Sequence, residues 1–568
     1  MTLPLPQLDP LRLKHLADCD GRYDAQTRLL GIRFTSPGYH TRLETDAWVH
    51  PTVPSLEYAV LLMRRADPAS LRRAEGIVRS VLPLQATDPT GPWYGVWPYA
   101  LEEPIPAMEN PDVNWADFCA GRLLEFLLEN RDRLDASLAR EVAAAIGHAA
   151  WGIFRRNIQP GYTNIAIMGA GVTAAAGEAL GDAKLLDYGR LRLANILRHV
   201  DYHGTFVEYN SPPYTMVALQ ECERMLHLVS DPEIRVGAER LRRVAWQVIA
   251  DHWHVGTHQW AGPHARAYAD RIDDITAGEL SLRLDLPIPV PPGCAPGVWT
   301  GPLNMTAVPI PCPAEMRCAF QEARAQERRQ LLIRRTAGAA SVYGTTWMIE
   351  EACLGSASED SLRPQARAVL GYWRGSGHVV GVLRVRMLKN GRDITSGRIS
   401  SVQKGPRLLA AFGFYADLGD WHWLLDRPAN NTFEIADLRV RFEITAPGAQ
   451  GSRLRPGVFR LSDGYRSTFI HTLPGRFADA PVAWELGSGE GCAYVDAICY
   501  QGARRPFQLT ASPPLILAAG LEFLGGSQTD ASQGPSLQTR GDELEAVWDI
   551  EPGLRLSHRL QAYPYVAN

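Results

Sequence analysis

The chain has 568 residues, of which 46% are hydrophobic and 21% are charged, an ordinary composition for a globular protein. The formal net charge is −4 at pH 7, so nothing global indicates a nucleic-acid or anionic-membrane partner, and an acidic ligand needs a local basic site. This length exceeds what one hydrophobic core supports, which predicts two or three domains.

The N-terminus and the cysteines predict the compartment. The first seven residues, Met-Thr-Leu-Pro-Leu-Pro-Gln, lack a basic region followed by an apolar one, which argues against a secretory signal. The most apolar window, residues 165–180, is shorter than a membrane span and contains Glu178. Nine cysteines without a CxxC pair favour neither a disulfide framework nor a four-cysteine zinc site. We expect a cytoplasmic protein.

Residues from about 55 to 256 have the periodicity of helices. Asp67-Pro68 and Asp231-Pro232 each place an N-cap acid before a proline at the first helical position. Apolar residues then recur at helical spacing, and these stripes are expected to form core. The amphipathic stretches are residues 115–128, 137–154, 185–200 and the segment that follows Asp231.

The stretch from Tyr162 to Gly177 is different, because it is apolar nearly all round and rich in small residues. Such a helix is buried on all sides and lets its neighbours approach closely. We place it in the inner layer of a two-layer helical array. Successive amphipathic helices joined by short turns then predict an α/α toroid, an incomplete barrel, over residues 1–285, although no clear sequence repeat supports it.

The sequence pattern changes after about residue 285. Proline-rich segments at 287–292 and 309–313 predict a linker region over 286–330, with brief helical character near 315–329. Short β runs then follow one another without intervening helices, which predicts an antiparallel β-sandwich over 331–568. The runs are 340–349, 378–387, 438–444, 544–550 and 554–562, with turn signals at Asn390-Gly391 and Asp463-Gly464.

One loop in the helical half contains several side chains that could take part in binding or catalysis. The stretch His203-Gly-Thr-Phe-Val-Glu-Tyr-Asn-Ser-Pro-Pro-Tyr214 lies between two helical segments, and its glycine and prolines exclude helix from it. Loops held by a rigid scaffold are where binding and catalytic groups concentrate. The alternative is an aromatic loop packed by its own side chains. The candidate groups in it are His203, Glu208, Tyr209, Asn210 and Tyr214.

Two further stretches carry polar groups of the same kinds. Thr163 and Asn164 open the small-residue helix, where either could simply cap it. The segment Ala261-Gly-Pro-His-Ala-Arg-Ala-Tyr-Ala-Asp-Arg271 offers a histidine, two arginines and a tyrosine after a turn, or is a solvated turn with a buried tyrosine.

These residue types suit the removal of the proton α to a uronate carboxylate. An amide donor and a cation or imidazolium must stabilise the developing aci-carboxylate. A tyrosine near cations, its pKa lowered from about 10, can take that proton and then protonate the departing glycosidic oxygen. The chemistry needs no cofactor and no metal. We expect no metal at His254 and His258 either, because Gly256 lies between them and HExxH is absent.

The order of these pieces resembles a known family. Thr163-Asn164, the loop 203–214, the segment Gly262-Pro-His-Ala-Arg-Ala-Tyr268 and a β-rich C-terminal half are similar to polysaccharide lyases of the chondroitin AC/alginate lyase and heparinase II/III-like type. The resemblance implies an α/α toroid followed by antiparallel β-sheets. It also implies a carbon–oxygen lyase that cleaves a uronate-containing oligo- or polysaccharide by β-elimination.

The resemblance also implies roles for single residues. Asn164 would neutralise the substrate carboxylate, and Tyr214 looks like the catalytic phenol, with Tyr209 as its rival. The hyaluronate/chondroitin branch has histidine where this chain has Tyr209, which leaves the general base open. His264 would supply the imidazole and Arg266 the cation. Substrate-binding residues would be His203, Glu208, Asn210, Tyr268 and Arg271, with a sugar-stacking wall of Trp93, Trp97 and Trp115 unless these are plain core aromatics.

Two other functions stay open at this point. One is a glycoside hydrolase on the same toroid that uses Glu208 with Asp273 or Asp274 as paired carboxylates. The other is a carbohydrate-binding protein without catalysis. In each case the expected partner is an oligo- or polysaccharide, acidic for the lyase, and neither nucleic acid nor membrane is expected. The sequence leaves open the sugar, the linkage, endo or exo action, and whether the protein forms a homo-oligomer.

Overall fold

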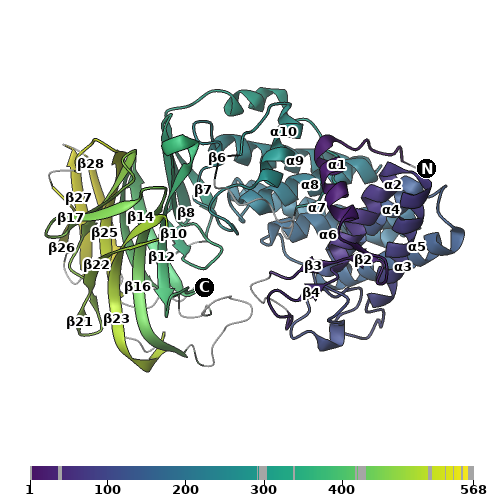
Figure 1. Cartoon of the computed structure of the whole chain (residues 1–568), viewed down its shortest axis with the longest axis horizontal. Coiled ribbons are helices and arrows are strands. Elements are labelled where there is room, and N and C mark those ends of the chain that lie inside the picture. The colour runs from purple at the N-terminus through teal and green to yellow at the C-terminus, as the bar shows by residue number, and fades with distance from the viewer. Residues whose placement is uncertain are drawn as a thin grey trace.

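The computed structural model shows a helical N-terminal part beside a β-rich C-terminal part (Figure 1). This confirms the predicted fold class, an α/α toroid followed by an antiparallel β-sandwich. The residues that the structure describes are 3–35, 41–290, 292, 303–336, 339–415, 419, 430, 432–509, 515–530, 533–540, 543–551 and 554–560.

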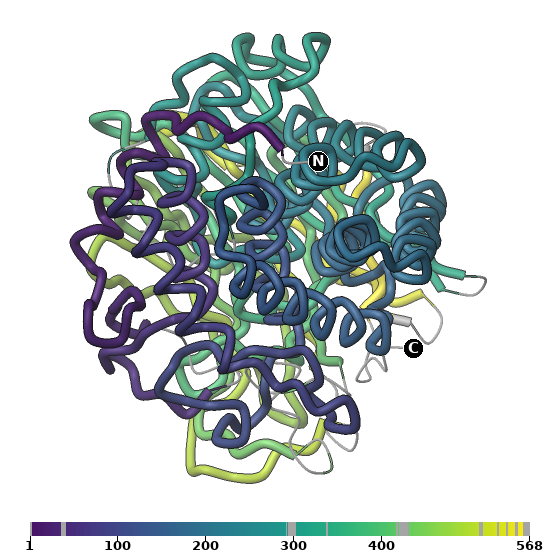
Figure 2. Tube along the Cα trace, turned by 90° about the vertical axis from the view of Figure 1, so that its right-hand side faces the viewer, coloured from purple at the N-terminus to yellow at the C-terminus, as the bar shows by residue number. Residues whose placement is uncertain are grey.

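The helices form two layers. Helices α2, α4, α6 and α8 each contact the next member of this set, while α3, α5, α7 and α9 pack behind them. Figure 2 looks onto this part, whose helices pass from purple through blue to teal around an open arc. The bounds are α1 Pro10–Asp20, α2 Thr52–Arg65, α3 Pro68–Val81, α4 Trp115–Asn130, α5 Ala136–Arg156, α6 Thr163–Leu180, α7 Ala183–His203, α8 Pro212–Leu228, α9 Pro232–His252 and α10 Asp274–Leu284.

The helix starts predicted from Asp-Pro pairs are confirmed. The Asp67 carboxylate accepts the backbone N–H groups of Ala69 and Ser70 at 3.0 Å, and α3 begins at Pro68. The Asp231 carboxylate accepts the N–H of Ile234 at 3.0 Å, and α9 begins at Pro232. Each carboxylate satisfies backbone donors that a helix start leaves without partners.

Helix α6 occupies the inner layer, as its small residues predict. From Thr163 to Ala170 every residue is buried. Glycine is required where α7 crosses it, because a Cβ at Gly177 would lie 2.5 Å from the backbone nitrogen of Leu186. The mirror contact occurs at Gly189, where a Cβ would lie 2.8 Å from that of Ala174.

The inner helices run in the same direction. Glu57 and Arg64 of α2 pair with Arg122 and Glu129 of α4 in the same order along the chain. In α8 and α10, Gln220 and Glu223 likewise meet Glu279 and Arg283. The N-terminal ends of these helices therefore lie at one end of the array, and their macrodipoles give that end positive potential.

Two large antiparallel sheets face each other across the second core. The first has the order β22 (Ala483–Gly489), β23 (Cys492–Gln508), β16 (Thr432–Thr445), β12 (Val380–Lys389), β11 (Val369–Arg374), β9 (Ala352–Ala357), β8 (Val342–Met348) and β7 (Gln326–Ile333), with β13 (Arg392–Asp393) beside β12. The second has the order β10 (Glu359–Ser361), β14 (Gly397–Lys404), β15 (Arg407–Phe414), β25 (Ala518–Gly525), β19 (Arg466–Thr472), β18 (Val458–Ser462) and β17 (Gln450–Arg455).

Smaller sheets complete the fold. A three-stranded sheet packs against β14 and β15 through its last strand, and the others are short ribbons. Their bounds are β26 Ser536–Arg540, β27 Glu543–Glu551, β28 Leu554–Leu560, β20 Arg476–Phe477, β21 Ala480–Pro481, β24 Leu515–Ile516, β1 Tyr23–Asp24, β2 Leu29–Leu30, β3 Ile32–Arg33, β4 Trp48–Val49, β5 Trp253–His254 and β6 Gln259–Trp260.

The turn signals of the sandwich are confirmed, and one helical expectation is wrong. Asn390 and Gly391 take positive φ between β12 and β13, and Gly464 does so between β18 and β19. The segment 315–329 was expected to be helical, but only Ala314–Phe320 is a 3₁₀ helix, and β7 already begins at Gln326. The side chains from Gln326 to Arg329 alternate between half-buried and exposed, the period of a strand. The exact domain boundaries stay predictions.

Two findings concern the environment of the chain. Every cysteine that the structure describes is unpaired, and most of them are buried. Within the described part of the chain, no helix combines the length and the apolar character that crossing a bilayer would demand.

Candidate active site

The loop between α7 and α8 is shorter than the sequence suggests. His203 is still the last residue of α7, and Gly204 ends that helix with a φ of 84°. Pro212 and Pro213 are the first two residues of α8 rather than part of the loop, and Ser211 caps the helix. Tyr214 therefore projects from the first turn of α8, a rigid element, at the N-terminal end of the inner layer.

Arg266 is the centre of a polar cluster. Its Nη1 donates to Glu208 Oε1 at 3.0 Å, and its Nη2 donates to Tyr214 Oη at 2.9 Å. Its Nε donates to Gln365 Oε1 at 2.9 Å, and Nη2 also lies 3.4 Å from Tyr268 Oη. A planar guanidinium thus binds groups from α8, from the loop before it and from the sandwich at once.

Glu208 connects this cluster to Asn164. Its Oε2 accepts the backbone N–H of Asn164 at 2.9 Å and the side-chain Nδ2 at 2.6 Å. Asn164 is fully buried, so its amide does not face solvent. The structure therefore brings Asn164, Glu208, Tyr214 and Arg266 together, with the asparagine acting on the carboxylate of Glu208.

Two tyrosines meet beside Arg266. The hydroxyl groups of Tyr214 and Tyr268 are hydrogen-bonded to each other. Tyr214 is 8% exposed whereas Tyr268 is 53% exposed, so only Tyr268 presents its ring to solvent. Burial, followed by the neighbouring Tyr268, raises the pKa of Tyr214 well above its ordinary value, and Arg266 opposes that rise. The sequence predicted a lowered pKa, but burial outweighs the cation.

The charge of Arg266 is secure. Burial disfavours the cation, but the nearby Tyr214, Tyr268 and Glu208 outweigh it and hold the pKa of Arg266 well above its ordinary value. The guanidinium also lies 4.0 Å from the ring centre of Tyr214, within cation–π range.

Tyr209 points away from this cluster. Its hydroxyl donates to Asp360 of β10, and its ring packs among Ala265, Leu332, Val342 and Ala357. Burial, followed by the charge of Asp360, raises the pKa of Tyr209 well above its ordinary value. The structure therefore separates the two rival tyrosines and gives Tyr209 a place in the junction with the sandwich.

The side chains of Asn210 and His264 contact backbone carbonyl groups and do not line an open space. Asn210 Nδ2 donates to the carbonyls of Ala261 and Pro263 at 2.7 and 2.8 Å. His264 Nδ1 lies 2.6 Å from the Asn210 carbonyl, and burial lowers the pKa of this imidazole to about 3. In the structure the His264 ring therefore holds the backbone of the loop, and the imidazolium role that the resemblance implies stays a prediction.

Two other expected binding residues also have structural partners. His203 Nδ1 accepts the backbone N–H of Arg334 at 3.0 Å, and burial lowers the pKa of that histidine. Arg271 donates from Nε and Nη2 to the carbonyl of Val380 at 2.9 and 2.6 Å. Both side chains contact the C-terminal part, not the Arg266 cluster.

The expected tryptophan wall is mostly core. Trp97 is fully buried and donates to the carbonyl of Val81 at 3.1 Å, so its ring cannot stack on a sugar. Trp93 and Trp115 are half-buried and pack against the helical core. Trp115 donates to Thr52 Oγ1 at 3.1 Å, and its ring centre lies 4.1 Å from that of Tyr99.

The hydrolase alternative placed a second carboxylate at the start of α10. Asp273 is the N-cap of that helix and accepts the N–H of Thr276 at 2.7 Å, and Asp274 is the first helical residue. Glu208, its expected partner, has both oxygens occupied by Arg266 and Asn164.

The sandwich holds the segment that carries Arg266. His264 and Arg367 form an antiparallel bridge, with N–H to carbonyl distances of 3.0 and 2.9 Å. The N–H of Ala267 donates to the Gln365 carbonyl at 2.6 Å, and the N–H of Ala265 donates to the Tyr209 carbonyl at 3.0 Å. Residues 264–267 are therefore fixed between the loop before α8 and the segment that follows β10.

Gln365 and Tyr162 carry only weak signals in the sequence, where a surface or packing role is the simpler interpretation. Gln365 lies in the run Arg363-Pro-Gln-Ala-Arg367, where polar residues between two β runs are a weak signal. Tyr162 precedes Thr163 directly, and its ring centre lies 5.8 Å from the Arg266 guanidinium carbon. Among the described residues, no three histidine, cysteine, aspartate or glutamate side chains are grouped as metal ligands.

Comparison with known proteins finds one matching family model and solved structures of similar fold. Residues 22–277 match a family model described as a domain of unknown function, DUF8769, and no curated protein matches the sequence. A crystal structure of heparinase III is similar with a TM-score of 0.50 and 10% identity, over 98% of this chain and 91% of that chain.

Two further structures have lower scores. A heparinase III with methylated lysines has a TM-score of 0.38 and 10% identity, over 98% of this chain and 91% of that chain. A mutant chondroitin AC lyase of Streptomyces coelicolor has a TM-score of 0.27 and 10% identity, over 90% of this chain and 95% of that chain. The likeness to heparinase III shows a shared fold.

Proposed function

We propose that the protein is a carbohydrate-active enzyme, a lyase that cleaves a uronate-containing oligo- or polysaccharide by β-elimination. The observation that carries the proposal is the cluster around Arg266, in which a cation holds a pair of phenols at the N-terminal end of α8. The fold shared with heparinase III supports the same class of substrate, although a fold alone does not fix a function.

The reaction that we propose uses the phenol pair to carry the proton. A phenolate takes the proton on C5 of the uronate, the electron pair forms the C4–C5 double bond, and the C4–O bond breaks. The same phenol then protonates the leaving oxygen. Arg266 stabilises the phenolate, and it also contributes positive potential toward the aci-carboxylate together with the N-terminal ends of the inner helices.

In this proposal Glu208 and Asn164 are positioning residues. Glu208 fixes the guanidinium of Arg266 through an ion pair, and Asn164 fixes Glu208 through two hydrogen bonds. Asn164 is fully buried, so it does not meet the substrate carboxylate directly as the resemblance implies. Its effect on the reaction passes through Glu208.

The hydrolase has less support from the same contacts. An inverting or retaining hydrolase needs one carboxyl group that is protonated and free to donate. Both oxygens of Glu208 instead accept hydrogen bonds from an arginine and an asparagine, so neither oxygen is free to donate a proton to a glycosidic oxygen.

The test is product analysis with a panel of uronate oligosaccharides that includes heparin-type and chondroitin-type chains. The proposal predicts an ultraviolet-absorbing unsaturated product whose fragments together lack the mass of one added water. Products that carry labelled oxygen from labelled water would indicate hydrolysis. Binding without turnover across the panel, in a folded preparation, would favour a carbohydrate-binding protein.

A further inference from the structure

The two phenols beside Arg266 are not equivalent. Tyr214 lies in the first turn of α8 with its ring against the guanidinium, and it is 8% exposed. Tyr268 lies two residues beyond Arg266 and is 53% exposed. A group that takes a proton from a sugar ring must touch that ring, and a general base needs to lie within hydrogen-bond reach of the proton. Tyr268 is the phenol that an incoming ligand meets.

The hydrogen bonds indicate which of the two hydroxyl groups donates and which accepts. Tyr214 Oη accepts from Arg266 Nη2 at 2.9 Å, and its own proton can then be donated to Tyr268 Oη in the bond that joins the two hydroxyls. Tyr268 Oη also lies 3.4 Å from the same Nη2. The Tyr268 oxygen thus can accept a hydrogen bond from a phenol and lies beside a cation, and donors placed in this way stabilise negative charge that develops during a reaction.

We propose that Tyr268 is the catalytic residue that takes and returns the proton, and that Tyr214 is a positioning residue whose O–H, with Arg266, stabilises the Tyr268 phenolate. This inference rests on the proposed function and deepens it. Burial keeps Tyr214 neutral in the pH range where Tyr268 acts, since it raises the pKa of Tyr214 well above its ordinary value.

The proton balance of this step closes without any further reactant. Tyr268 first loses its proton to solvent. Its phenolate then takes the proton from C5 of the uronate, while the C4–C5 double bond forms and the C4–O bond breaks. The proton now on Tyr268 passes to the departing oxygen, which restores the phenolate. Tyr214 keeps its own proton throughout and shifts it only along the hydrogen bond to Tyr268.

The groups that act on the Tyr268 phenolate come from three segments. Tyr214 comes from α8 and Arg266 from the same segment as Tyr268. Tyr99, which donates to Asp112 at 3.0 Å, faces Tyr268 from the loop before α4. Glu208 lies behind Arg266 and holds it in place. A neutral Tyr214 and a charged Arg266 are therefore the groups that lie next to the Tyr268 oxygen.

The experiment compares Tyr268→Phe, Tyr214→Phe and the control Tyr465→Phe in the full-length protein. Tyr465 is 55% exposed and lies on a hairpin of the sandwich. Two readouts are taken: turnover against pH of the uronate oligosaccharide that the wild type cleaves, and NMR titration of tyrosines labelled at Cζ. Circular dichroism and Tm establish that each variant is folded.

The expected result separates the two phenols. Tyr268→Phe lowers kcat about 1000-fold, within the range of lost acid–base catalysis, and removes the NMR signal of Tyr268. Tyr214→Phe keeps that signal but moves it to higher pH by about one unit, and it moves the alkaline-rising limb of the kcat profile by the same amount. Tyr465→Phe changes neither readout.

Two contrary results have different meanings. If the wild type forms unsaturated product and Tyr268→Phe keeps about a tenth or more of its kcat, the assignment to Tyr268 is wrong while the lyase stands. The same holds if Tyr214→Phe abolishes turnover without moving the titration of Tyr268. If the wild type forms no unsaturated product from any uronate, the proposed function itself fails.

Discussion

At the scale of single residues, the site depends on the geometry of one guanidinium. Arg266 directs Nε, Nη1 and Nη2 to three different acceptors, from Gln365, Glu208 and Tyr214. A planar fork can hold these acceptors in one arrangement, whereas an ammonium group acts as a point charge on a flexible chain. The site therefore requires arginine rather than any cation.

Replacing Arg266 by lysine tests this requirement. We expect Arg266→Lys to lower kcat about 100-fold or more, because the lysine cannot reach all of the acceptors and the phenolate loses its donor. The carboxylate of Glu208 also loses its ion pair, which should reduce the free energy of unfolding by about 2 kcal/mol. The measurements are steady-state kinetics and denaturant unfolding, with the exposed Arg240→Lys as the control. Unchanged turnover in Arg266→Lys would contradict this role.

The sequence predicts the residue types of the site better than their directions. Asn164, Tyr214 and Arg266 meet as expected. The choice between Tyr209 and Tyr214 could not be made from spacing, because it depends on where α8 begins. Pro212 starts that helix and turns Tyr214 toward Arg266, while Tyr209 stays in the loop and meets the sandwich. The burial of His264 could not be predicted from spacing either, because it follows from long-range packing.

At the scale of elements, the sandwich completes a site that the toroid begins. The segment after β10 pairs with residues 264–267 through backbone hydrogen bonds and supplies the Gln365 side chain to Arg266. Helix starts and the small-residue helix were predictable because their signals are local. The strand at Gln326 and the pairing of distant segments were not, because each depends on contacts far along the chain.

Removing the Gln365 amide tests the contribution of the sandwich. In Gln365→Met the Nε of Arg266 loses its acceptor, which is worth about 1 kcal/mol. We expect kcat to fall about fivefold, since a tenfold change would need about 1.4 kcal/mol, with little change in KM or Tm. Gln321→Met, at an exposed position after the 3₁₀ helix, is the control. A kcat equal to that of the control would show that Gln365 does not position Arg266.

At the scale of the whole molecule, the interior of the toroid is an ion network rather than an open channel. Five arginines and six glutamates from α1, α2, α4, α8 and α10 are buried there and linked by ion pairs. The members are Arg12, Arg64, Arg122, Arg224, Arg283, Glu57, Glu125, Glu129, Glu221, Glu223 and Glu279.

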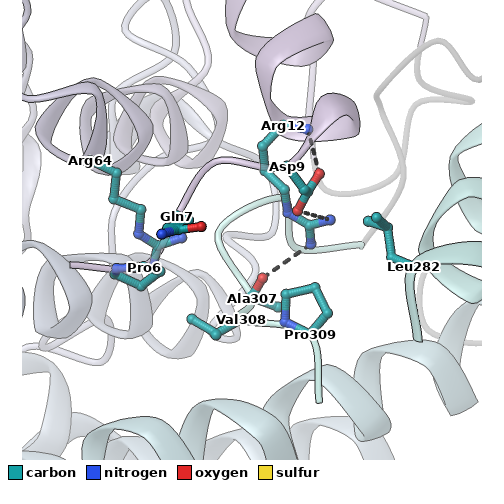
Figure 3. Close-up of a pocket in the computed structure, with 9 residues that line it drawn as sticks. All are labelled: Pro6, Gln7, Asp9, Arg12, Arg64, Leu282, Ala307, Val308 and Pro309. Atoms are coloured by element: carbon teal, nitrogen blue, oxygen red, sulfur yellow. Dashed lines mark hydrogen bonds and ion pairs between the residues drawn. The ribbon is translucent and has the colours of Figure 1, made fainter. Parts of the chain in front are cut away.

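The pocket in Figure 3 belongs to this network and not to the candidate site. Arg12 and Arg64 line it, and Arg12 Nη2 donates to the carbonyl of Ala307 at 3.1 Å. Arg64 pairs with Glu129 near the C-terminal ends of α2 and α4. The Arg266 cluster lies at the opposite, N-terminal end of these helices, so the pocket and the proposed catalytic groups are separate.

Glu57 is the member of the network whose protonation should affect stability. Burial raises the pKa of Glu57 to about 7, although Arg122 opposes it. The folded protein then holds a proton that the unfolded chain releases at a lower pH, so stability falls as the pH rises from about 4.5 to about 7. The variant Glu57→Gln has no carboxyl group at this position, so it does not lose stability in this way as the pH rises.

The stability of Glu57→Gln relative to the wild type should therefore increase by roughly 3 kcal/mol between about pH 5 and about pH 8. Denaturant unfolding at each pH measures the difference, and Glu141→Gln on the exposed face of α5 serves as the control. A difference that stays constant across this range would mean that Glu57 is already ionised in the folded protein.

If a phenol removes the C5 proton of a uronate, deuterium placed at that carbon must be lost when the chain is cleaved. The wild-type enzyme is incubated with a uronate oligosaccharide labelled at C5, and the label is followed by mass spectrometry and NMR. We expect an unsaturated sugar that has lost the deuterium from C5 and a slower reaction than with the unlabelled substrate. Cleaved products that keep the deuterium on C5 would contradict it.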